Sequence, residues 1–199
     1  MPTNELIALL AFISAMTFTP GPNTTLSTAL AANHGLRHAL RFVVSVPVGW
    51  AMMIVGCAFG LGALIESLPV LRGAIKWLGI GYMLWLAWKL SRSGELARAR
   101  DGALDVGFLQ GVMLQFINVK AWMNALLISA SWVAVATPVM PRLMVVLPVM
   151  MAYGFASNFT YALVGSALRG WLAQGRRLLV FNRILAAVLL GTALWMARL

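Results

Sequence analysis

A helix-breaking motif interrupts the first apolar stretch of the chain, and it consists of Thr19, Pro20, Gly21, Pro22 and Asn23. Proline has no amide hydrogen, so the carbonyl oxygens four residues earlier, on Met16 and Phe18, lose the donors that a helix would give them. An unpaired backbone group costs several kcal/mol in hydrocarbon, so such a break persists only where protein packs around it or where it lines a polar cavity. Residues 19–23, called the first break below, are therefore a candidate binding site.

The first break offers groups of both charges to a ligand. Pro22 fits the first turn of a new helix, and the free amides beyond it, on Asn23, Thr24 and Thr25, favour an anion such as a carboxylate. The orphan carbonyls that end the preceding helix favour a cation such as an ammonium group. A zwitterionic amino acid would satisfy both. The alternative is a proline kink that only shapes helix packing, since proline is common in membrane helices.

Lys120 lies deep inside a later apolar stretch. It follows Gly107 by about 13 residues and precedes Val135 by about 15, so it lies roughly 20 Å from either end of a helix that rises 1.5 Å per residue. Ionisable residues at such depth usually serve function. No Asp or Glu lies at a comparable depth, so we expect a substrate carboxylate or orphan backbone carbonyls to pair with the ammonium group. The alternative is a tilted or offset helix that lets Lys120 reach the interface.

Two asparagines complete the candidate site. Asn118 lies beside Lys120, and Asn158 lies in another apolar stretch. Side-chain amides hydrogen-bond across membrane helices, and they are packing contacts about as often as ligands, so both interpretations stay open. The candidate substrate-binding residues are Thr19, Pro20, Gly21, Pro22, Asn23, Thr24, Asn118, Lys120 and Asn158, and no catalytic residue is predicted.

The composition predicts that these residues lie in an integral membrane protein. Of the 199 residues, 61% are hydrophobic and 10% are charged, and the mean hydropathy is +0.88, whereas soluble domains carry about 25% charged residues. The expected fold is all-α, a single transmembrane domain over 1–199 with six spanning helices. We expect these helices near 5–32, 39–65, 69–90, 107–135, 143–168 and 178–197.

The net charge of +10 fits the positive-inside rule better than a nucleic-acid patch, because the basic residues are scattered between apolar stretches. With the N-terminus outside, the inner side carries Arg37, Arg41, Lys89, Arg92, Arg98, Arg100, Arg169, Arg176, Arg177 and Arg183. The outer side carries Arg72, Lys76, Arg142 and Arg198. We therefore expect both termini in the periplasm and no nucleic-acid partner.

Residues 91–106 form a long polar connection that divides the chain into halves of about 3–92 and 107–198. Each half would hold three spans, and because three is odd, the halves would cross the membrane in opposite senses, as in inverted-repeat transporters. The second half also opens with a stretch that departs from an apolar pattern, at residues 115–120. The predicted fold is therefore a 3+3 inverted repeat with an interrupted first helix.

Few residues could support enzyme chemistry. The single cysteine, Cys57, permits no intrachain disulfide, and the two histidines, His34 and His38, lie in a basic connection. The sequence therefore predicts a transporter with no cofactor and no metal. A membrane redox carrier or enzyme is one alternative, and a structural subunit or passive channel is another.

Four motifs resemble the lysine exporter (LysE/RhtB) family of bacterial amino-acid exporters along the whole chain. They are the first break, Ala32-Asn33-His34-Gly35-Leu36-Arg37, Leu84-Trp85-Leu86-Ala87-Trp88-Lys89 and Gln115-Phe116-Ile117-Asn118-Val119-Lys120. The resemblance implies a secondary exporter of the bacterial inner membrane that works by alternating access. Its implied partners are an amino acid and the lipid bilayer; a proton is the candidate coupling ion, with Lys120 as the titrating group, and a homo-oligomer stays open.

The fourth motif refines the resemblance. Most family members have proline at the position of Val119, whereas the form found here, together with Asn158, is similar to the branch of cysteine and O-acetylserine exporters. This favours a small neutral amino acid over lysine or arginine. Since Val119 keeps its amide hydrogen, the sequence leaves open whether the fourth helix is also interrupted near mid-membrane or stays helical and contributes mainly the charge of Lys120.

Overall fold

The computed structural model describes residues 1–96, 105–135 and 137–198, and it contains only helices and connections over those ranges. This confirms the all-α prediction. The elements are α1 (Thr3–Phe18), α2 (Pro22–His34), α3 (Leu36–Ala58), α4 (Leu61–Ser67), α5 (Pro69–Leu96), α6 (Phe108–Ile117), α7 (Val119–Ile128), the π-helical turn η1 (Ser129–Val133), α8 (Met140–Leu172) and α9 (Arg177–Ala197).

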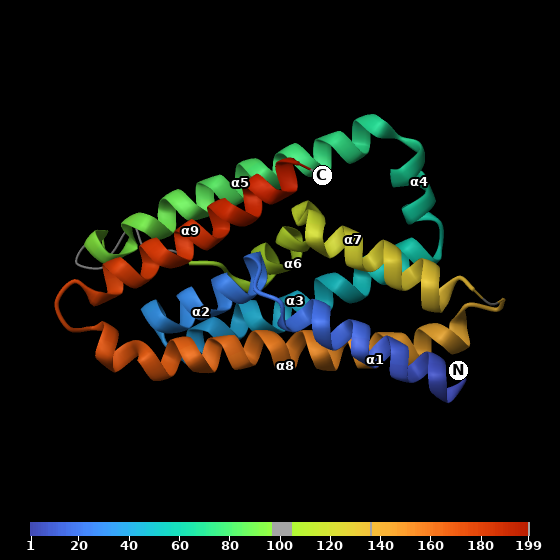
Figure 1. The fold of residues 1–199 in the computed structure, drawn as a ribbon, viewed down its shortest axis with the longest axis horizontal. Coiled ribbons are helices and arrows are strands. Elements are labelled where there is room, and N and C mark those ends of the chain that lie inside the picture. The colour runs from blue at the N-terminus through green and yellow to red at the C-terminus, as the bar shows by residue number, and fades with distance from the viewer. Residues whose placement is uncertain (97–104, 136, 199) are drawn as a thin grey trace.

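The helices run back and forth along the long axis of the molecule (Figure 1). Among the described residues, α3, α8 and α9 are each long and apolar enough to cross a membrane. Two bent pairs, α1 with α2 and α6 with α7 and η1, raise the number of candidate spans to as many as five. α5 lies outside this group; it is 28 residues long and carries basic residues toward both ends.

The first break is present as predicted. α1 ends at Phe18, α2 begins at Pro22, and the two helices meet at an angle of 52°. Pro22 occupies the first turn of α2, where its missing amide hydrogen costs no helical bond. The amide of Gly21, the residue just before α2, donates to Oγ1 of Thr24 over 2.9 Å. A side chain from the first turn of the helix thus pairs a backbone amide at the helix start.

A second break lies between α6 and α7, so the fourth helix, which the sequence left open at Val119, is interrupted in the structure. Asn118 adopts an extended conformation (φ −88°, ψ 101°), and the two helices meet at 73°, a sharper angle than at the first break. The Asn118 Oδ1 atom accepts the Lys120 amide at 3.1 Å and caps α7. The Phe116 carbonyl then accepts the Trp122 indole N–H at 2.8 Å. Side-chain hydrogen bonds thus stabilise the bend, although no proline is present at this position.

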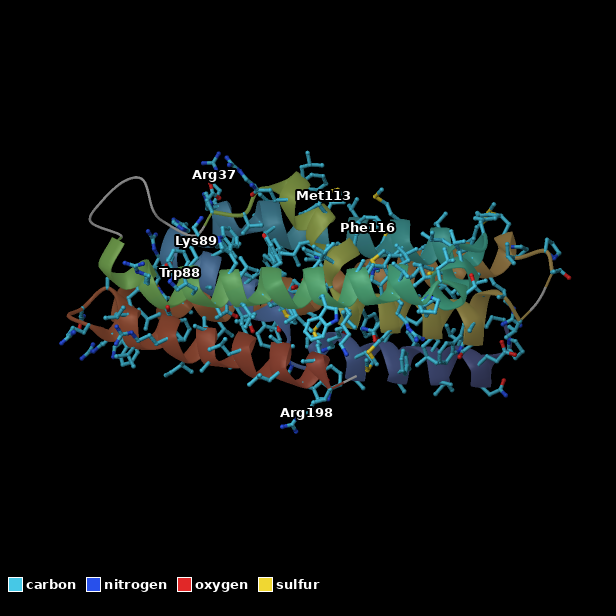
Figure 2. The ribbon with its side chains drawn as sticks, turned by 90° about the horizontal axis from the view of Figure 1, so that it is seen from above. Arg37, Trp88, Lys89, Met113, Phe116 and Arg198 are labelled. Carbon is cyan, nitrogen blue, oxygen red and sulfur yellow. The ribbon has the colours of Figure 1, made fainter. Side chains whose placement is uncertain are left out.

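Two other predicted boundaries differ from the structure. The helix expected over 39–65 is divided at Gly60, whose φ of 104° is a left-handed conformation that favours glycine, and α4 follows as a separate short helix. α5 continues to Leu96, so it occupies the start of the connection expected at 91–106. Residues 97–104, with Arg98 and Arg100, lie outside the described residues. Figure 2 shows Arg37, Trp88 and Lys89 toward one end of the molecule, and it shows Arg198 farther from that end.

α2 lies inside the bundle, and its residues 22–32 are all buried. Many of these residues are small or polar, which lets neighbouring helices approach closely. Gly165 of α8 shows how close this approach is, because a Cβ atom there would lie 2.3 Å from the Thr28 carbonyl oxygen. The contact between α2 and α8 therefore depends on a glycine at this position.

We expect Gly165→Ala to lower the melting temperature of the purified protein in detergent, because the methyl group meets backbone and such overpacking costs about 1–3 kcal/mol. Gly170→Ala on the same helix is the matched control, since a Cβ atom there meets nothing within 4 Å. Equal melting temperatures for the two variants, measured by differential scanning fluorimetry, would contradict the close approach of α2 and α8.

Candidate functional site

The two breaks lie against each other in the middle of the bundle. Lys120, two residues after the second break, donates from Nζ to the Thr19 carbonyl oxygen in the first break over 3.0 Å. A Cβ atom at Gly21 would lie 3.4 Å from the same Nζ atom, so glycine leaves room for the lysine side chain. Residues about 100 positions apart in the sequence therefore form one polar centre.

A small cavity occupies this centre, and it has a volume of about 20 Å³, room for about one water molecule. Its lining includes eight of the predicted residues: Thr19, Gly21, Pro22, Asn23, Thr24, Asn118, Lys120 and Asn158. Met16, Thr17, Trp50 and Ala121 complete the lining. Pro20 does not line it and instead borders a neighbouring groove. An amino acid needs more space, so the structure is a closed form of the site.

The carbonyl oxygens that end α1 are paired with side chains of other helices. Thr17 O accepts the Ser157 hydroxyl at 2.7 Å, and Phe18 O accepts the Tyr161 hydroxyl at 2.9 Å. The Phe18 carbonyl, which Pro22 deprives of a helical donor, therefore has its partner within the protein and not in a ligand. Sequence reasoning missed Ser157 and Tyr161, although both neighbour Asn158 on α8 and lie four residues apart, on one face of the helix.

The amides at the start of α2 are only partly available to a ligand. Thr25 was expected to present a free amide, and this is wrong, because its N–H donates to the Gly21 carbonyl at 3.0 Å. The carbonyl of Gly21 also accepts the Thr24 hydroxyl at 3.1 Å. The Gly21 carbonyl is thus paired within the first turn of α2. These bonds stabilise the helix start and oppose its opening around a carboxylate.

Gln115 is the most connected side chain of the site, and sequence reasoning did not include it among the binding residues. Its amide and that of Asn23 exchange hydrogen bonds of 2.8 and 3.2 Å. Gln115 Oε1 also accepts the Trp50 indole N–H at 3.0 Å, and Nε2 donates to the Gly111 carbonyl at 2.9 Å. Its side chain is fully buried. The feature of the sequence that could have identified Gln115 is its polar side chain, three residues or about one helical turn before Asn118.

Asn158 contacts α2 as well as the cavity. Its Oδ1 atom accepts the Ser27 hydroxyl at 3.0 Å, and its Nδ2 atom donates to the Gly154 carbonyl at 2.8 Å. The residue is 1% exposed. Both ends of the amide are therefore paired within the protein, which favours a packing role between α2 and α8.

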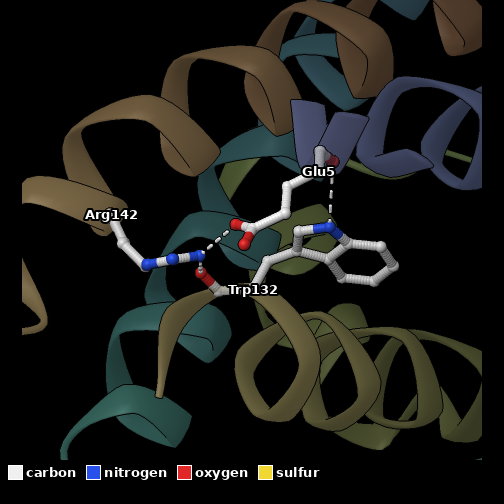
Figure 3. A network of polar contacts seen from close by, with 3 residues as sticks. All are labelled: Glu5, Trp132 and Arg142. Atoms are coloured by element: carbon white, nitrogen blue, oxygen red, sulfur yellow. Dashed lines mark hydrogen bonds and ion pairs between the residues drawn. The ribbon is translucent and has the colours of Figure 1, made fainter. Parts of the chain in front are cut away.

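A polar network joins the two halves of the chain near the N-terminus (Figure 3). Arg142 of α8 donates from Nη1 to Glu5 Oε2 over 2.7 Å and to the Trp132 carbonyl over 3.3 Å. The Trp132 indole N–H donates to the Glu5 carbonyl at 3.2 Å. The network fastens the start of α1 to η1 and α8.

Other contacts fasten the opposite end. Asn33 of α2 and Asn182 of α9 exchange two side-chain hydrogen bonds of 3.0 Å each. His38 of α3 lies 2.8 Å from an oxygen of Asp105, just before α6. These contacts hold α2 to α9 and α3 to the segment before α6.

Comparison with known proteins identifies the family. The model of the LysE type translocator family matches residues 14–198. A protein from Klebsiella pneumoniae named cysteine/O-acetylserine efflux protein is 32% identical over 97% of both chains. A protein of the same name from Salmonella choleraesuis is 31% identical over 88% of both chains. Another from Escherichia coli K12 is 30% identical over 91% of this chain and 90% of the relative. No solved structure matches the chain. With the family model covering nearly the whole chain, this protein belongs to the LysE family of translocators.

Proposed function

We propose that this chain exports small neutral amino acids from the cytoplasm, with cysteine and O-acetylserine as the first candidates. It is a transporter and not an enzyme, since the family is one of translocators. The relatives named above support these substrates. The described cavity lining also supports a neutral side chain, because it contains Lys120 as its single charged residue and no carboxylate that could pair with the second cation of lysine or arginine.

The contact between Lys120 and Thr19 carries the proposal for binding. In this structure the Lys120 ammonium group donates a hydrogen bond to a backbone carbonyl of the first break. A substrate carboxylate would draw Nζ away from Thr19, because an ion pair with a carboxylate is stronger than a bond to a neutral carbonyl. The freed carbonyl could then accept the substrate ammonium group. One movement of Lys120 would thus create both halves of the amino-acid site.

The remaining predicted residues have supporting roles in this proposal. Thr24 and Asn118 line the cavity and pair backbone groups at the two breaks, so we assign them to holding the broken backbone around the substrate. Asn23 is held by Gln115, and Asn158 by Ser27, so we assign these two to the rigid wall. Pro20, Gly21 and Pro22 keep the backbone broken.

We propose six spans in a 3+3 inverted repeat. The bent pairs each count as one span, and α5 is the sixth. The breaks support the repeat, because each lies in the first span of its half, and broken helices at matching positions are typical of such transporters. The distribution of basic residues supports an orientation with both termini in the periplasm. The chain is then a multi-pass protein of the inner membrane, and alternating access would open its two ends in turn.

A proton is the candidate coupling ion, and Lys120 is the candidate group to carry it, because the cavity lining contains no other ionisable side chain. Efflux from proteoliposomes against imposed pH and voltage gradients tests this assignment. A rate that ignores the pH gradient would remove the proton from the mechanism.

We expect Lys120→Met to reduce efflux of labelled cysteine by about 10–100-fold, the loss that follows from one missing hydrogen bond to a charged group. Lys76→Met is the control, because Lys76 lies on α5 and does not line the cavity. The measurement is counterflow into substrate-loaded proteoliposomes, which also separates a carrier from a channel. Equal rates for Lys120→Met and Lys76→Met would refute the site, and absent counterflow by the wild type would refute the carrier.

We expect Glu5→Gln to open the periplasmic end, since the change removes the charge that pairs with Arg142. Partly exposed pairs are worth about 1 kcal/mol or less, so labelling of a cavity cysteine should rise about two- to fivefold. A Thr17→Cys, Cys57→Ser background supplies that cysteine, an impermeant maleimide added outside is the probe, and Arg198→Gln is the control. Unchanged labelling in Glu5→Gln would contradict a closing role for this network.

A further inference from the structure

A groove of about 530 Å³ adjoins the central cavity between the end of α1, α7 and α9. It is lined by Met16, Thr19, Pro20, Lys120, Met123, Asn124, Val188, Gly191, Thr192 and Trp195. Three of these residues, Met16, Thr19 and Lys120, also line the central cavity. This α7–α9 groove is therefore the immediate neighbour of the site, and Lys120 belongs to the wall between them.

Asn124 is the unexplained polar residue of the α7–α9 groove. It is 4% exposed, and its Oδ1 atom has no hydrogen-bond partner among the residues that the structure describes. Buried amide oxygens are nearly always paired, so an unpaired one calls for a missing ligand, ion or water. Asn124 follows Lys120 by four residues on α7, which puts both on one face of the helix. The groove thus has one cation in its wall and one unused acceptor buried directly behind the wall.

We propose that the α7–α9 groove is a second site for the exported amino acid, occupied after the central cavity; this rests on the function proposed above. Lys120 would hold the substrate carboxylate, and the Asn124 side-chain amide would turn so that its oxygen accepts the substrate ammonium group. Met123, Val188 and Trp195 supply an apolar wall for the substrate side chain. The groove has ample space for an amino acid, whereas the closed central cavity has not.

Because the two sites share Lys120, a substrate that moves between them exchanges few of its interactions. A carboxylate that moves from the cavity to the groove can keep Lys120 as its partner throughout, because Nζ is at the end of a long flexible side chain. Only the ammonium group changes partner, from the Thr19 carbonyl to the Asn124 amide. The charged carboxylate is then never left unpaired inside the protein, which would be the most costly step of the passage.

An amino acid fits the groove better than a lipid tail does. An acyl chain would cover the apolar wall and leave Asn124 unpaired, whereas a zwitterion satisfies both Lys120 and Asn124 with the spacing of one helical turn. The Thr192 hydroxyl donates to the Val188 carbonyl at 2.9 Å, so its oxygen keeps lone pairs for a further donor. The groove lining holds no acidic residue, and it therefore favours the same neutral substrates as the cavity.

Filling the groove tests the proposal. Gly191 lines it, and a Cβ atom there meets nothing within 4 Å, so Gly191→Leu can place a side chain in the space without displacing a neighbour. Gly81→Leu on α5 is the matched control, a helical glycine with equally empty surroundings and no part in the groove. We expect Gly191→Leu to slow cysteine efflux from proteoliposomes at least about fivefold and Gly81→Leu to leave it within about twofold, a range in which surface changes usually fall.

Binding of labelled cysteine to the purified protein gives the second measurement. Because the two sites share Lys120, we expect one molecule per chain, bound more weakly by Asn124→Leu than by the wild type. Equal affinity in the two, or normal efflux in both Gly191→Leu and Asn124→Leu while Lys120→Met is inactive, would overturn the second site and leave the exporter intact. Retention of co-purified phospholipid by the wild type, lost in Gly191→Leu with unchanged efflux, would assign the groove to lipid. Absence of cysteine efflux by the wild type would instead reject the proposed function.

Discussion

The need to pair broken backbone away from water governs the arrangement of this molecule. Two helices stop in mid-bundle, and each exposed carbonyl or amide requires a partner from elsewhere in the chain. Ser157 and Tyr161 serve the end of α1 from α8, and Lys120 serves it from α7. These bonds hold together segments that are distant in sequence. The polar centre is therefore both the proposed binding region and a contact that keeps the two halves together.

Polar pairing also explains why α2 can lie in the interior. A helix with threonine, serine and asparagine along its length is a poor lipid-facing segment, yet residues 22–32 are buried on every side. Asn23 pairs with Gln115, Ser27 with Asn158, and Asn33 with Asn182, each on a different helix. One short helix thus contacts α6, α8 and α9 through specific hydrogen bonds, and its small side chains let those helices come near.

Much of the site could be predicted from the sequence, because prolines and a deep lysine have strong physical consequences wherever they occur. The first break, Lys120 and the helical fold followed from such residues. The partners could not be predicted in the same way. Gln115, Tyr161 and Ser157 look like ordinary polar residues in apolar stretches, and only the packing of α6 and α8 against the first break assigns them a role. The second break stayed open at Val119 for a related reason: propensity alone cannot foresee that Asn118 will cap a new helix.

The two breaks differ in how readily they can be undone. Pro20 and Pro22 make the first one permanent, since no conformation restores the missing amide hydrogens. The second has no proline, and its bend depends on Asn118 and on a cap of the kind worth about 1 kcal/mol. Residues 116–122 all keep the amide hydrogens that a continuous helix would use. The centre of the protein therefore combines a corner fixed by covalent structure with a bend held by hydrogen bonds, and Lys120 is attached to that bend.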